Sequence, residues 1–312
     1  MPSQRKHPAR HTAPAAAPAG VVYGLLADAP RWPVLLPSYV HVERVDFDGA
    51  QDSLRLWHLR HGQVRCVLAR RVLHPRERRI DFELTDPLLP GAPTHGSWNV
   101  SPQGGGRCLV TLCQDAAAAS GQGPDMLEAQ VRAQLAAVVE AAERWDRLDE
   151  LLLSFEDSLH VTGSPEIVYD FLYRIADWAD LVPHVERAEV TEDVPGVQRA
   201  VLHTSDPGTG DTGVVESVRL CFPAAGRIVH KQTVTPDPVA AHYGEWSLEP
   251  DASGVRVACT HQVMLREATP APGAGARPAD ARRHVREWLG RTSTEALTLA
   301  RWHAESALRR LR

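Results

Sequence analysis

Residues 21–37 read VVYGLLADAPRWPVLLP, and residues 167–183 read IVYDFLYRIADWADLVP. The second segment has Val, Tyr, Leu, Trp and Pro where the first has them, each 146 positions further along the chain. Apolar residues at helical spacing open the first segment, and Pro33 and Pro37 then limit the next helix to about one turn. A unit that returns in the same order predicts a chain built by tandem duplication.

The repeat continues along both halves of the sequence. The tetrapeptide His41–Arg44 returns as His184–Arg187, at an offset of 143. Six further residues return at an offset of 148: Arg71, Ile80, Gly96, Trp98, Pro102 and Gln114 match Arg219, Ile228, Gly244, Trp246, Pro250 and Gln262. Arg144-Trp145 returns as Arg301-Trp302. Matches in the same order at nearly constant spacing indicate two copies that differ by loop insertions and deletions.

Each copy has the same order of predicted elements: a strand, two helices, six antiparallel strands and a long helix. Turn residues separate the strands of the first copy, which we expect at 40–48, 53–60, 64–73, 79–85, 94–100 and 107–114. Apolar periodicity predicts one helix from Pro124 to about Leu153 and another from about Pro278 to Leu311. Trp98, Trp246, Trp145 and Trp302 are expected in the core. We therefore predict α+β domains at 1–153 and 154–312, each with a curved sheet, a long helix and an apolar cavity between them.

Composition narrows the function. With 43% hydrophobic and 23% charged residues, the chain is expected to fold as a globular protein. A net charge of −5 favours neither nucleic acid nor an anionic membrane as a partner. There is no apolar run long enough to cross a membrane and no secretory signal. Five cysteines without a Cys-x-x-Cys pair indicate neither a disulfide framework nor a Cys-rich zinc site. We expect a cytoplasmic protein.

The order of elements, with Trp32-Pro33 before Tyr39 and an Arg-Arg-Val strand, resembles the polyketide aromatase/cyclases. These proteins belong to the START-like, Bet v 1-like helix-grip superfamily (SRPBCC). The tandem arrangement is similar to the didomain subclass of bacterial type II polyketide synthases. That closer resemblance rests on the duplication, the paired Gly-x-Trp segments at Gly96 and Gly244, and the arginine-bearing strands. It implies two tandem helix-grip domains, each wrapped around its C-terminal helix.

The resemblance also implies site residues, because single-domain relatives use a pocket Trp and Tyr and a Ser-x-Arg strand. The first copy supplies Trp32, Tyr39 and Arg71, with Ala69 at the serine position. The second supplies Trp178, Ser217 and Arg219, with Val185 beside His184 at the tyrosine position. Gln114 and Gln262 match a last-strand glutamine, and His184 and His261 are further candidates for proton transfer. Neither copy is complete, so either domain or both can carry the chemistry, and the first is favoured for its Trp, Tyr and Arg.

The function implied is the first-ring aldol cyclisation, commonly between C7 and C12, and the dehydration of a ketoreduced poly-β-ketone carried by an acyl carrier protein. Orientation of the chain supplies much of such catalysis. Arg71 or Arg219 would hold the developing oxyanion, Tyr39 would relay a proton, and the Trp residues would stack on the ring. Neither metal nor cofactor is expected, and the partners are the carrier protein and other synthase components. The alternative is a non-catalytic lipid- or polyketide-binding protein, because the same cavity serves both.

Overall fold

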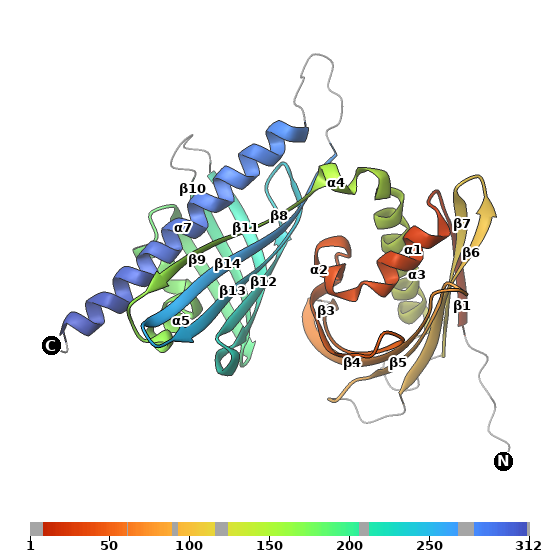
Figure 1. Cartoon of the computed structure of the whole chain (residues 1–312), viewed down its shortest axis with the longest axis horizontal. Helices are drawn as coiled ribbons and strands as arrows, with labels where there is room; N and C mark the ends of the chain where they lie inside the picture. Colours follow the sequence, from red (N-terminus) through yellow and green to blue (C-terminus); the bar gives the residue numbers. More distant parts are fainter. Residues whose placement is uncertain are drawn as a thin grey trace. The chain divides into compact units, whose positions relative to one another are not determined.

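The computed structural model describes residues 9–60, 62–88, 93–115, 124–205, 212–267 and 278–310. The chain divides into two compact units, Met1–Leu148 and Asp149–Arg312. Each unit contains one curved antiparallel sheet of seven strands wrapped around one long helix, α3 in the first and α7 in the second (Figure 1). This is the helix-grip architecture that the sequence predicts, present twice.

The first sheet has the order β1-β7-β6-β5-β4-β3-β2. Its strands are β1 (Ala9–Ala15), β2 (Tyr39–Phe47), β3 (Gln51–Arg60), β4 (Gln63–His74), β5 (Arg79–Thr85), β6 (Thr94–Gly104) and β7 (Arg107–Gln114). Two helices, α1 (Ala19–Ala27) and α2 (Trp32–Leu35), separate β1 from β2, and α3 (Pro124–Glu143) follows β7. Strands of consecutive number pair because their connections are short, and only β1 crosses to join β7.

The second sheet repeats this order as β8-β14-β13-β12-β11-β10-β9. Its strands are β8 (Leu152–Val161), β9 (Val185–Val194), β10 (Val197–Ser205), β11 (Thr212–Phe222), β12 (Arg227–Val234), β13 (Val239–Asp251) and β14 (Gly254–Leu265). Helices α5 (Pro165–Tyr173) and α6 (Trp178–Leu181) follow β8, and α7 (Pro278–Arg310) closes the domain. The six predicted strands and two predicted helices of each copy are therefore confirmed.

The predicted continuous helix from Pro124 to Leu153 is wrong at its end. Helix α3 stops at Glu143, and a 3₁₀ turn (Trp145–Arg147) and the short helix α4 (Leu148–Leu151) lead into β8. The cause is geometric, because Arg144 leaves the helical region at φ −88°, ψ 7° and turns the chain toward the second sheet. Trp145, just past this turn, is 43% exposed, and Trp302, inside the unbroken α7, is 64% exposed, so the expectation that both lie in the core is wrong. Trp98 and Trp246 lie in the core as expected.

Strand register corrects two of the sequence matches. Tyr39 pairs with His58 and Val185 pairs with Thr204, so the offset between the copies is 146 here. His41–Arg44 and His184–Arg187 are therefore not equivalent in the fold, although their letters agree. In the last strand, Gly96 pairs with Gln114 but Gly244 pairs with His261, so the counterpart of Gln114 is His261.

Candidate active site in the second domain

A row of five cross-strand neighbours runs across the core face of each sheet. In the first domain the row is Asp52, Arg71, Phe82, Gly96 and Gln114. In the second domain it is Gln198, Arg219, His230, Gly244 and His261. The arginine and the glycine occur in both rows, and the other three positions differ. The two rows therefore differ in charge and in hydrogen-bonding groups.

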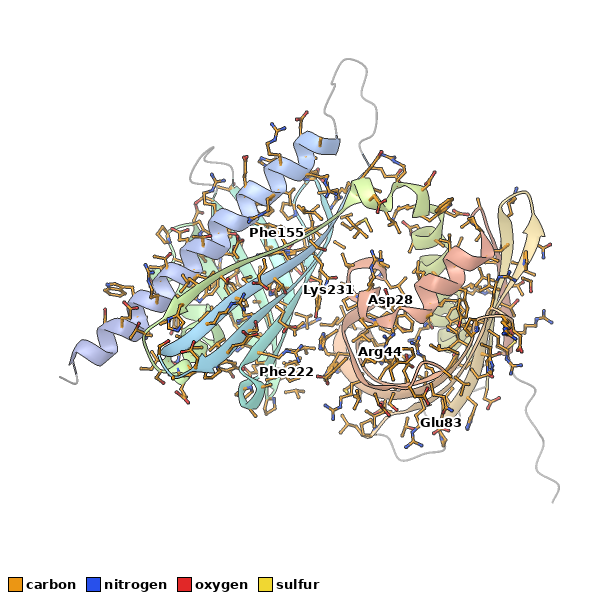
Figure 2. All side chains as sticks on the ribbon, viewed as in Figure 1. Asp28, Arg44, Glu83, Phe155, Phe222 and Lys231 are labelled. Atoms are coloured by element: carbon orange, nitrogen blue, oxygen red, sulfur yellow. The ribbon has the colours of Figure 1, made fainter. Side chains whose placement is uncertain are left out.

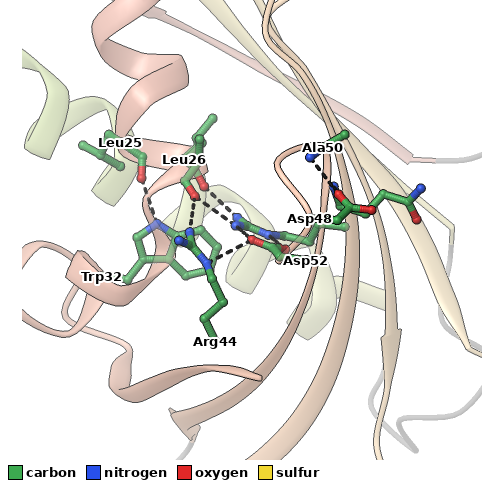
Figure 3. Close-up of polar contacts among 10 residues, drawn as sticks. Leu25, Leu26, Trp32, Arg44, Asp48, Ala50 and Asp52 are labelled. Atoms are coloured by element: carbon green, nitrogen blue, oxygen red, sulfur yellow. Dashed lines mark hydrogen bonds and ion pairs between the residues drawn. The ribbon is translucent and has the colours of Figure 1, made fainter. Parts of the chain in front are cut away.

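In the first domain, Arg71 is held by a full set of protein acceptors. Its guanidinium is 4% exposed and donates Nε to Asp52 Oδ1 at 2.8 Å and Nη2 to Asp52 Oδ2 at 2.5 Å. It also donates Nη1 to the Leu26 carbonyl at 2.8 Å and Nη2 to the Ala27 carbonyl at 2.9 Å. Figure 3 labels Leu26 of α1 and Asp52 of β3, two of these acceptors. The Asp52 carboxylate also lies 3.5 Å from Arg44 Nε. Because its two-point ion pair is with Arg71, Arg71 ties α1 to the sheet rather than presenting a free cation.

In the second domain, the equivalent Arg219 binds the same backbone positions but has no carboxylate in the place of Asp52. Nη2 donates to the Leu172 carbonyl at 2.5 Å, and Nη1 donates to the Tyr173 carbonyl at 3.2 Å. Nη1 also donates to Gln198 Oε1 at 2.6 Å, and no carboxylate of the described residues forms an ion pair with Arg219. Arg219 is 2% exposed, and burial lowers its pKa from the ordinary value. Its positive charge is thus only partly compensated.

The Trp and Tyr residues predicted for the site are buried, and the indole N–H of each Trp donates a hydrogen bond to a backbone carbonyl. The Trp32 indole donates to the Leu25 carbonyl at 2.9 Å, and the Trp178 indole donates to the Phe171 carbonyl at 3.1 Å. In the first domain, Tyr39 packs against Trp32 with ring centroids 4.8 Å apart, and its hydroxyl accepts from Gln134 Nε2 at 2.9 Å. Burial raises the pKa of Tyr39 to about 12, so its phenol is neutral at physiological pH.

A cavity of about 270 Å³ lies in the second domain between the sheet and α7. Five of the predicted site residues line it: Trp178, His184, Ser217, Arg219 and His261. His184 lies against α7, where its Nδ1 is 2.5 Å from Glu295 Oε2. Strand alternation places Gln262 on the opposite face from His261, so the expectation that Gln262 contacts the substrate is not supported by its position. Gln114 shares the core face of the first sheet with Val110 and Leu112.

Three histidines gather at the sheet side of this cavity. His242 Nε2 and His261 Nδ1 are 3.0 Å apart and share a hydrogen bond, and the edge of the His230 ring meets His242 at 5.3 Å between centroids. His261 Nε2 lies 3.3 Å from Cys259 Sγ, and its ring stacks on Phe155 of β8 (Figure 2) at 4.6 Å. Burial lowers the pKa of His261 to about 3 and those of His230 and His242 well below the ordinary value. All three are therefore neutral at physiological pH.

Sequence reasoning identified His261 but missed His230 and His242. Comparison of the two copies at a constant offset of 148 carries the signal, because His230 and His242 stand where the first copy has Phe82 and Thr94. The same comparison gives Ser217 opposite Ala69 and Gln232 opposite Leu84. At three of these positions, Ser217, His230 and Gln232 replace an apolar residue of the first copy. The described residues contain no group of three or more His, Cys, Asp or Glu side chains that could hold a metal ion.

Two domains of this architecture, one with a cavity lined by an arginine and imidazoles, define a didomain protein of the helix-grip class. The family model described as "Polyketide cyclase / dehydrase and lipid transport" matches residues 7–144 and 153–303. The chain belongs to this family, and each of its two halves matches the family model. Among the described residues, no helix combines the length and the apolar character needed to cross a membrane.

Relatives match along nearly the whole chain. The granaticin polyketide synthase bifunctional cyclase/dehydratase of Streptomyces violaceoruber is 30% identical over 99% of this chain and 97% of its own length. The actinorhodin polyketide synthase bifunctional cyclase/dehydratase of Streptomyces coelicolor is 34% identical over 94% of this chain and 95% of its own length. These are similarities of the complete two-domain arrangement rather than of one domain.

Two solved structures are similar to this chain in both sequence and fold. The di-domain ARO/CYC StfQ from the steffimycin biosynthetic pathway superposes with a TM-score of 0.85 at 28% identity, covering 96% of this chain and 99% of its own. The di-domain ARO/CYC BexL from the BE-7585A biosynthetic pathway gives a TM-score of 0.82 at 32% identity, covering 96% and 98%. The predicted fold and the predicted family are thereby confirmed.

Proposed function

We propose that this chain is a bifunctional cyclase/dehydratase of an aromatic type II polyketide synthase, and that dehydration takes place in the cavity of the second domain. The observation that carries the proposal is Arg219, a buried cation at the cavity wall whose partner in the sheet is the neutral Gln198. Both halves of the chain match relatives named for these two activities. The second domain replaces the first as the favoured place for the chemistry, because Arg71 is already neutralised by Asp52.

The chemistry needs a cation where negative charge develops. Removal of a proton next to a ketone gives an enolate, and a fixed guanidinium stabilises it without reorganising solvent. Arg219 is pre-organised for this task by two backbone carbonyls and Gln198. Ser217 is two residues away on the same face of β11 and can hydrogen-bond a second oxygen of the substrate. Trp178 provides an aromatic wall for the new ring.

The other predicted residues have supporting parts in this proposal. His184, fixed by Glu295, lines the same cavity and orients the substrate. In the first domain, protein partners hold Trp32, Tyr39 and Arg71, so these residues have a structural part. The finer assignment is a first-ring closure between C7 and C12 of a ketoreduced poly-β-ketone tethered to an acyl carrier protein. It rests on the family resemblance alone.

The test is reconstitution with a minimal polyketide synthase and a ketoreductase, with products identified by mass spectrometry. Wild-type protein is expected to replace spontaneous shunt products with a first-ring aromatic product. Arg219→Gln should lose that product. Arg71→Gln is the matched control, because it removes the equivalent carbonyl contacts in the other domain, and it should keep the product in proportion to its folded fraction.

Two outcomes contradict the proposal. Retention of the aromatic product by Arg219→Gln would remove the second cavity from the chemistry. An unchanged shunt pattern with folded wild-type protein, together with tight retention of a hydrophobic dye, would favour the non-catalytic binding protein.

A further inference from the structure

His230 is the cross-strand neighbour of Arg219 and lines the same cavity. His230 is partly buried, and no described residue forms a hydrogen bond with its ring. Neighbours of this kind have Cβ atoms about 5 Å apart, so a base and a cation can reach the same substrate carbonyl unit. Resting on the proposed function, we propose that His230 is the general base that removes the ring-carbon proton during dehydration.

The surroundings keep this base in its neutral form. Burial has the largest effect on the pKa of His230, and the positive charge of Arg219 and the neighbouring His242 lower it further. A neutral imidazole at physiological pH can accept a proton at once, without first losing one. The weaker basicity that accompanies a low pKa is offset by Arg219, which stabilises the enolate formed in the same step.

The step balances without an added reagent. His230 takes the proton from the carbon next to the carbonyl, and the electrons of that C–H bond form the enolate held by Arg219. The enolate then re-forms the carbonyl, makes the carbon–carbon double bond and breaks the C–O bond of the neighbouring hydroxyl. The proton on His230 passes to the departing hydroxide, giving water and restoring the neutral base. The return is favoured because an imidazolium beside Arg219 is repelled by the guanidinium.

His242 and His261 act as positioning residues for His230. The hydrogen bond between them fixes both rings, and His261 is held in turn by Cys259 Sγ and by stacking on Phe155. The rings of His230 and His242 meet in a T-shaped contact. A fixed wall reduces the number of orientations open to the base, which is how pre-organised groups contribute to rate.

Gly244 supplies the space that His230 occupies. A Cβ atom built on Gly244 would lie 2.5 Å from His230 Cε1 and 2.6 Å from its Nε2, closer than any real contact. In the first domain, Gly96 makes the same space for Phe82, with a Cβ atom 2.3 Å from the Phe82 ring. The same position of the row holds a phenyl ring in the first domain and an imidazole in the second. His230→Phe therefore removes the base and puts in its place a residue that the first domain already has there.

The experiment measures water elimination from a β-hydroxy ketone thioester of the cyclised type, using the full-length protein. His230→Phe and His230→Gln should lower the rate constant of dehydration about 10²–10⁴-fold and change KM less than threefold, with undehydrated cyclised product accumulating. Added imidazole should restore part of the rate to His230→Ala, which a merely structural role does not predict. Phe82→Leu, at the equivalent position of the first domain, is the control and should keep the wild-type rate.

The proposal is overturned if His230→Phe and His230→Gln, folded by circular dichroism, dehydrate within fivefold of wild type. That result differs from a failure of the proposed function itself, in which the wild-type protein would not dehydrate the substrate at all.

Discussion

Gln198→Asp converts the second domain to the charge arrangement of the first. Gln198 Oε1 accepts from Arg219 at 2.6 Å, whereas Asp52 forms a two-point ion pair with Arg71. An enolate bound to the far side of Arg219 would lie roughly 6 Å from the new carboxylate. At an effective dielectric constant of about 20, two such charges repel by about 2.8 kcal/mol, which corresponds to a rate about 100-fold lower.

The assay compares dehydration rate with thermal stability for two variants. Gln198→Asn is the matched control, because it has the size of Asp and no charge, and it should keep the rate within about threefold of wild type. Gln198→Asp should lose about 100-fold in rate, and the melting temperatures show that both variants are folded. A folded Gln198→Asp protein whose rate matches that of Gln198→Asn would refute the role given to the charge of Arg219.

Three further outcomes follow from the buried groups. Asp52→Asn leaves the Arg71 guanidinium without an ion pair in the core, and urea unfolding of the N-terminal domain should show a loss of about 3 kcal/mol. Gly244→Ala should destabilise the protein by about 2 kcal/mol, because the added methyl group overlaps the His230 ring. Gly24→Ala should raise the stability of α1 slightly, because no atom lies within 4 Å of the added methyl group. Melting temperatures distinguish the two variants. The pKa of His261 is about 3 when folded and about 6.5 when unfolded, so the unfolded state binds an extra proton in that window. Unfolding free energy should therefore fall by about 1.4 kcal/mol per pH unit for this group below pH 6.5, and His261→Gln should show a shallower decline in acid titrations.

Most of the fold could be predicted because periodicity and turn residues act locally. The spacing of Val131, Leu135 and Val138 indicates a helix packed on one side, and all three are buried in the core of the first domain. The end of that helix could not be predicted from the same pattern. Trp145 continues the apolar period, but the chain has to turn at Arg144 to enter the next sheet, and that requirement is set by the domain junction.

Register was the second limit of the sequence. The letters of Gln114 and Gln262 agree, but one residue fewer separates Gly244 from its partner in the last strand, and a shift of one position exchanges the two faces. Alignment by residue identity therefore matched Gln114 with Gln262, whereas strand pairing makes His261 the counterpart of Gln114. Trp32, Trp178, Ser217 and Arg219 are buried as expected, and β10 pairs with β11, which carries Ser217 and Arg219, without a shift.

The state of an arginine is harder to predict than its position. Arg71 and Arg219 occupy equivalent positions, bind equivalent carbonyls and are almost equally buried, so nothing in their own segments distinguishes them. The distinction comes from one residue on the neighbouring strand, a carboxylate in one copy and an amide in the other.

Duplication makes this divergence possible without loss of the fold. A single domain that replaced Asp52 by an amide would weaken the tie between α1 and the sheet while acquiring an uncompensated charge. With two copies, Arg71 remains an ion-paired structural tie, and in our proposal Arg219 stabilises an anion. The aromatic beside it can then become an imidazole, because Gly244 already provides the space that Gly96 provides for Phe82. The five-residue row is thus one structural device used for packing in the first domain and, in our proposal, for enolate chemistry in the second.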